Sequence, residues 1–105
     1  MAIVPLRNET SMIAKLTTSH DWMRVAVTDA AKNKISLTMS RYKESCSGTG
    51  ISRETLKAAI YAFNKLRMKK TGQTMGERMQ AILELAQKAT TIDEYVKSLE
   101  QIAAA

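Results

Sequence analysis

Apolar and polar positions alternate along two stretches in the first half of the chain. Met23, Val25 and Val27 occupy every second position of the first stretch, and Ile35, Leu37 and Met39 those of the second. A period of two places apolar side chains on one face of a β-strand, and the polar residues 29–33 between the stretches suit a turn. The pattern predicts a β-hairpin within residues 22–40. A helix over residues 22–32 is the competing interpretation, because Trp22 and Val25 also fit a helical period.

The second half changes to a period of 3.6 and predicts three helices. They begin after Ser52, Thr74 and Thr91, which are good N-cap residues. Glutamate follows each of the two threonines at the spacing of a capping box, at Glu77 and Glu94. The first helix extends to about residue 70 and ends at Gly72, which can take a left-handed C-cap conformation.

The remaining first half gives weaker patterns. Asn8 or Thr10 could cap a short helix through Leu16, and the composition of residues 45–50 suggests a loop. We therefore expect an α+β fold, mainly α, in which a β-hairpin precedes a compact three-helix unit. An all-α bundle is the alternative. The chain fits a single domain of residues 1–105, made of an N-terminal segment 1–50 and a three-helix unit 51–105.

Composition argues against several classes of protein. Cys46 is the only cysteine and His20 the only histidine, so the chain offers neither an internal disulfide nor a Cys/His metal site. It lacks a phosphate-binding glycine loop followed by lysine, a signal-peptide-like start and an apolar run of membrane-spanning length. We expect a cytoplasmic protein that is not an enzyme and that uses no cofactor.

Charge is unevenly distributed. The net charge is +6. Residues 53–70 hold six cations against one acid, Glu54, whereas residues 71–105 carry more acids than bases. A concentrated basic segment is typical of proteins that bind nucleic acid or another polyanion.

The predicted helix 52–70 separates into two faces. Leu56, Ala59, Ile60, Phe63 and Leu66 gather on one side and are expected to face the core. Steps of four residues align Arg53, Lys57, Tyr61, Lys65 and Lys69 on the other side. Lysine and arginine suit phosphates, and a tyrosine can stack on a base. The candidate nucleic-acid-binding residues are Arg53, Lys57, Tyr61, Lys65, Arg67, Lys69, Lys70, Arg41 and Lys43.

Two known DNA-binding motifs resemble parts of the chain. Residues 50–60 resemble the second half of a helix-turn-helix, although residues 45–49 lack the apolar positions of its first helix. The alternating stretch 35–42 followed by helices resembles a ribbon-helix-helix protein, although about nine residues separate strand from helix.

These patterns favour a small basic nucleic-acid-binding protein, either a regulator or a helical subunit of a nucleoprotein assembly, that contacts the phosphate backbone through helix 52–70. The partner is DNA or RNA. The alternative is a protein-interaction module, an adaptor or small inhibitor that binds an acidic protein surface. Apolar positions such as Leu85 in the C-terminal helices also suggest a homodimer or a larger complex. No membrane partner is expected.

Overall fold

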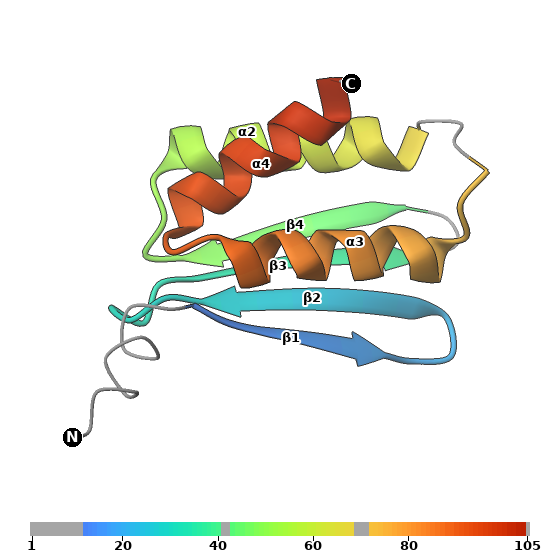
Figure 1. The fold of residues 1–105 in the computed structure, drawn as a ribbon, viewed down its shortest axis with the longest axis horizontal. Coiled ribbons are helices and arrows are strands. Elements are labelled where there is room, and N and C mark those ends of the chain that lie inside the picture. The colour runs from blue at the N-terminus through green and yellow to red at the C-terminus, as the bar shows by residue number, and fades with distance from the viewer. Residues whose placement is uncertain (1–11, 41–42, 69–71, 105) are drawn as a thin grey trace.

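In the part of the chain that the structure describes, four antiparallel strands precede three helices (Figure 1). The computed structural model describes residues 12–40, 43–68 and 72–104. The strands are β1 (Ile13–Thr18), β2 (Trp22–Thr28), β3 (Lys34–Ser40) and β4 (Glu44–Thr49), and they neighbour one another in sequence order. The helices are α2 (Arg53–Met68), α3 (Met75–Lys88) and α4 (Ile92–Ala104). This confirms the α+β class and excludes the all-α alternative.

The predicted hairpin is confirmed as β2 and β3. Val25 pairs with Leu37 and Val27 with Ile35, so the alternating apolar residues share one face. In the turn, one oxygen of the Asp29 carboxylate accepts the backbone N–H groups of Ala31 and Asn33 at 2.9 and 2.8 Å. These bonds hold the polar connection closed.

Two predictions for the first half were wrong. The stretch expected to end a short helix at Leu16 is strand β1, and the expected loop over residues 45–50 is mostly strand β4. Both strands lie at the edges of the sheet. The positions of β4 on the helix side hold Glu44, Cys46 and Gly48, so small and polar residues hide its alternation.

The helix starts follow the predicted chemistry. Thr74 and Glu77 form a complete capping box, with the Glu77 N–H donating to the Thr74 hydroxyl at 3.1 Å and the Thr74 N–H donating to the Glu77 carboxylate at 2.8 Å. At α4 the Glu94 N–H donates to the Thr91 hydroxyl, but the Glu94 carboxylate accepts from Thr90 instead. These Thr90 hydrogen bonds lower the pKa of Glu94.

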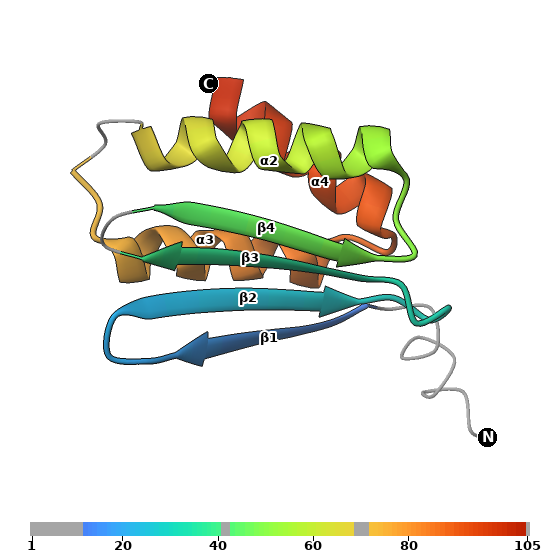
Figure 2. The same cartoon turned by 180° about the vertical axis from the view of Figure 1, so that it is seen from behind.

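All three helices cover the same face of the sheet. Helix α3 packs on β1 and β2, α2 packs on β4 and β3, and α4 packs against α2 and α3 (Figures 1 and 2). Arg78 of α3 also reaches the end of α2, where its Nη1 donates to the carbonyl oxygens of Leu66 and Arg67 at 2.8 Å each. The opposite face of the sheet has no covering element among the described residues.

The core lies between the sheet and the helices. Its largest fully buried side chains are Tyr95, Phe63, Ile35, Leu37, Met79, Ile82, Leu99, Val25 and Val27. Ile60 was wrongly expected to face this core: its side chain is 43% exposed, and Ala62 is buried instead. Ile60 instead lines a hollow between α2 and the β4 edge of the sheet, together with Glu44 and Ser45, so its side chain is covered only in part.

The topology also differs from both DNA-binding motifs. A strand, β4, precedes α2 where a helix-turn-helix would have its first helix. Strand β3 pairs with β2 and β4, so it has no free edge for the intermolecular pairing of a ribbon-helix-helix dimer. None of the helices in the described ranges has the length and apolar character to cross a membrane.

Candidate nucleic-acid interface

Helix α2 presents a strip of exposed residues, Arg53, Lys57, Tyr61 and Lys65, called here the α2 strip. Burial of Ala59, Ala62 and Phe63 on the other side of the helix fixes its rotation. Tyr61 is 66% exposed, and the Lys65 Nζ atom lies 5.7 Å from the centre of its ring. The strip therefore combines charge with an accessible aromatic side chain.

The cations of the α2 strip have no acidic partner within the described part of the chain. The two contacts of this kind found there join Arg67 to Glu44 and His20 to Asp21, and the second is an ion pair only when the imidazole is protonated. The one acid of the helix itself, Glu54, makes neither of them. An exposed cation without a carboxylate partner can bind an external anion without first breaking an ion pair.

The structure places Arg67 away from the strip. Its side chain is 25% exposed, and its Nε atom lies 3.9 Å from the Glu44 carboxylate of β4. This ion pair ties α2 to the sheet edge, which gives Arg67 a structural contact that the sequence pattern did not reveal. Of the other predicted residues, Lys43 is exposed beside the sheet, and Arg41, Lys69 and Lys70 lie outside the described residues.

A second basic surface covers the side of the sheet that faces away from the helices, called here the open sheet face. The strand register places there Ile13, Lys15, Thr17, Trp22, Arg24, Ala26, Thr28, Lys34, Ser36, Thr38, Ser40, Ser45, Ser47 and Thr49. Three of these residues are cations and none is acidic. Lys43, directly before β4, adds a fourth exposed cation.

One end of the open sheet face is hollowed around an aromatic side chain. Trp22, Arg24, Thr38, Ser40, Lys43 and Ser45 line this hollow of about 180 Å³. The Arg24 guanidinium carbon lies 4.7 Å from the centre of a Trp22 ring, and Arg24 Nε donates to the Thr38 hydroxyl at 2.9 Å. The hydrogen bond and the cation–π contact together hold Arg24 in place.

The sequence carried a signal for this second surface. Trp22 and Arg24 occupy the polar positions of the alternating strand, which puts them on one face. The sequence did not reveal that no described helix or strand covers this face, or that Lys15, Lys34 and Lys43 join it from other parts of the chain.

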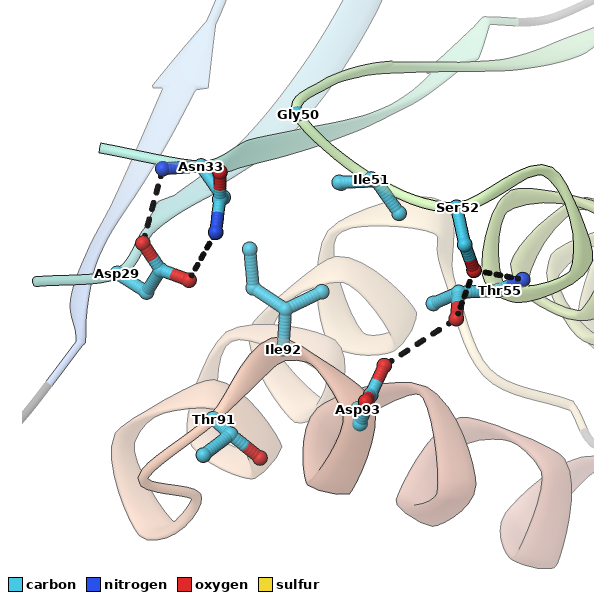
Figure 3. A pocket seen from close by; sticks show the side chains of 9 residues that line it. All are labelled: Asp29, Asn33, Gly50, Ile51, Ser52, Thr55, Thr91, Ile92 and Asp93. Atoms are coloured by element: carbon cyan, nitrogen blue, oxygen red, sulfur yellow. Dashed lines mark hydrogen bonds between the residues drawn. The ribbon is translucent and has the colours of Figure 1, made fainter. Parts of the chain in front are cut away.

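Another hollow, of about 220 Å³, lies between the β2–β3 turn and the starts of α2 and α4 (Figure 3). Its polar groups bond to one another: Asn33 Nδ2 donates to Asp29 at 3.0 Å, Ser52 to Thr55 at 2.9 Å, and Thr55 to Asp93 at 3.2 Å. The Asp29 and Asp93 carboxylates line the space where an anion would approach the helix ends. The hydrogen bonds in this hollow therefore stabilise the fold, and its carboxylates do not suit an anion.

Cys46 lies half-buried on β4, on the helix side of the sheet. Burial raises the pKa of its thiol to about 12, so the thiol stays protonated at neutral pH and is a poor nucleophile. Burial also raises the pKa of Tyr95, whose hydroxyl has no hydrogen-bond partner among the described residues. Within the same residues, no three of His, Cys, Asp or Glu gather closely enough to hold a metal ion.

Comparisons with protein families, with curated proteins and with solved structures find no match to this chain.

Proposed function

We propose that this protein binds nucleic acid without catalysing a reaction, and that the α2 strip contacts the phosphate backbone. The observation that carries this proposal is the set of exposed cations at Arg53, Lys57 and Lys65, which have no acidic partner in the described part of the chain. Cations of this kind release the counterions of a nucleic acid on binding, which makes the affinity depend on salt.

The dimensions of the strip suit a phosphate backbone. Twelve residues separate Arg53 from Lys65, which is roughly 18 Å along an α-helix. That length equals the rise of about five base-pair steps along the axis of B-form DNA, at one phosphate of each strand per 3.4 Å of axis. Tyr61, between the cations, can stack on a base or donate its hydroxyl to a phosphate.

The charge of α3 and α4 also favours binding of nucleic acid through α2 rather than through these two helices. The acids Glu77, Glu84, Asp93, Glu94 and Glu100 are exposed on or beside α3 and α4. Five acids against Arg78, Lys88 and Lys97 make α3 and α4 net acidic, so a polyanion is attracted more strongly to the α2 strip and the open sheet face.

A salt titration with a matched control tests this proposal. Fluorescence anisotropy measures the affinity for a labelled random oligonucleotide at several salt concentrations, for the wild type and two double variants. Lys57→Ala with Lys65→Ala removes two charges from the α2 strip. Lys88→Ala with Lys97→Ala removes two exposed charges from α3 and α4.

The strip variant should weaken binding and lower the log–log salt slope by about 0.7–0.9 for each lost contact, because each lysine neutralises one phosphate. The control variant should keep the wild-type slope. Equal slopes in the two folded variants would contradict the role of α2. Tighter binding of polyglutamate than of any nucleic acid would instead support the alternative of an acidic protein partner.

A further inference from the structure

We propose that the open sheet face binds single-stranded nucleic acid, with one base stacked on the Trp22 ring in the hollow at its end. This inference rests on the proposed nucleic-acid function and names the form of nucleic acid that is bound. It also assigns the base contact to a surface other than α2.

Charge complementarity is the first argument. Lys15, Arg24 and Lys34 come from β1, β2 and β3, and Lys43 stands at the start of β4, so positive charge extends across the whole width of the sheet. No acidic side chain of the four strands points to this face. The open sheet face therefore offers a basic surface to a phosphate backbone.

The aromatic side chain is the second argument. Trp22 is half-buried on a face that otherwise carries mainly serine, threonine and lysine. Arg24 lies over part of its ring, and Thr38 holds Arg24 in that position. Indole rings and guanidinium groups are both surfaces on which unpaired bases stack.

The polar rim of the hollow is already ordered. The Ser40 hydroxyl donates to the Lys43 carbonyl oxygen at 3.0 Å and accepts the Lys43 N–H at 3.1 Å. These bonds fix the backbone that carries Lys43 beside Trp22. A phosphate that follows a base stacked on Trp22 would thus meet a cation on a constrained segment.

The shape of the surface favours a single strand over a duplex. Four strands with three gaps of about 4.8 Å give a sheet roughly 14 Å wide before side chains are added. The major groove of B-form DNA is only about 12 Å wide and admits a two-stranded ribbon or one helix. Bases inside a duplex are also stacked on one another, so they are not accessible to Trp22.

The hollow also adjoins the α2 helix around the edge of the sheet. Ser45 lines it and lines a second hollow of about 210 Å³ that contains Ile60 and Asn64 of α2. A single-stranded nucleic acid that runs from Trp22 past Ser45 therefore reaches α2, the helix that carries the α2 strip. The open sheet face and the α2 strip can therefore bind successive parts of one nucleic-acid strand.

Trp22 is the only tryptophan of the chain, so its fluorescence reports directly on the proposed contact. The experiment titrates the protein with oligothymidylate, with oligouridylate and with a random-sequence duplex of the same length. Anisotropy of labelled oligonucleotides measures binding in parallel. We expect both single strands to quench Trp22 and to bind more tightly than the duplex, and the tighter of the two distinguishes DNA from RNA.

Trp22→Ala should weaken single-strand binding by about 5- to 150-fold, which corresponds to the ~1–3 kcal/mol of a base stacked on an aromatic residue. Trp22→Phe should recover part of the affinity, because a ring remains. Gln87→Ala changes an exposed residue of α3, outside both basic surfaces, and should change affinity less than twofold. Thermal melting shows whether each variant is folded.

Three results would overturn the inference: single strands that bind without changing Trp22 emission, a folded Trp22→Ala variant with wild-type affinity, or a duplex that binds as tightly as a single strand. Each of these leaves the proposed function standing, because nucleic acid is still bound. Absence of binding to all three oligonucleotides at low salt would overturn both proposals.

Discussion

The α2 strip and the open sheet face are both basic, but they are built in different ways. The strip comes from one helix, where a step of four residues aligns Arg53, Lys57 and Lys65. The open sheet face draws its cations from residues as far apart as Lys15 and Lys43. A helix gathers charge by local periodicity, whereas a sheet gathers it only after its strands have paired.

Their chemistry differs as well. The strip offers exposed lysines and one largely exposed tyrosine, which suit contacts to the phosphate backbone. The open sheet face offers an indole ring with an arginine held over it. This difference suggests a division in which α2 supplies affinity that depends on salt and the sheet supplies the contact to a base.

Replacement of Phe63 is expected to have the largest effect on stability, because this side chain packs α2, which carries the α2 strip, against the sheet. It is fully buried on α2 and lies beside Cys46 of β4. Phe63→Ala should lower the free energy of unfolding by about 3–5 kcal/mol, because it removes a large core side chain and leaves a cavity. Urea denaturation measures this loss.

Ile60→Ala is the control for that variant on the same helix. Its side chain is 43% exposed, so the expected cost stays below about 1 kcal/mol. Equal losses for the two variants would mean that the rotation of α2, and with it the position of the α2 strip, is wrong.

A smaller effect is expected at Gly50, which joins β4 to α2. Its φ is +71°, and a Cβ atom there would collide with the Asn33 side chain. Gly50→Ala should cost roughly 2–3 kcal/mol, because the collision adds to the ~1–2 kcal/mol of a left-handed non-glycine residue.

Gly72 provides a matched comparison for Gly50. It has a similar φ of +77°, but a Cβ atom there meets no atom of the described residues within 4 Å. Gly72→Ala should therefore show only the backbone cost of about 1–2 kcal/mol. A larger loss at Gly72 than at Gly50 would contradict the packing of the turn against the start of α2.

The contrast between local periodicity in a helix and long-range pairing in a sheet explains what could be predicted from the sequence. Capping residues and helical periodicity predicted all three helices and the exposed α2 strip, because these signals are local. Strand β4 escaped prediction because Gly48 and Cys46 replace the large apolar residues that mark a strand. Strand β1 escaped it because Leu16 is the one large apolar residue among its helix-side positions. Ile60 looked like a core residue because a helical wheel does not show how much of a helix its neighbours cover.

The open sheet face depends on long-range structure in the same way. Alternation alone puts Trp22 and Arg24 on one side of β2, but all three helices could have covered that side. Only the observed placement of α2 and α3 on the opposite side leaves it available. The candidate base contact was therefore absent from the sequence-based set, which named only Lys43 of this hollow.

The most direct test of the account maps the bound strand on the protein. Amide chemical shifts, measured by NMR during titration with oligothymidylate, report on every surface at once, and Trp22 contributes a single indole N–H signal. The account predicts large shifts for that signal, for the central strands β2 and β3 and for the α2 strip, with little change around Lys88 and Lys97 of α3 and α4. Shifts confined to α3 and α4, or an unmoved Trp22 indole signal at saturation, would contradict it.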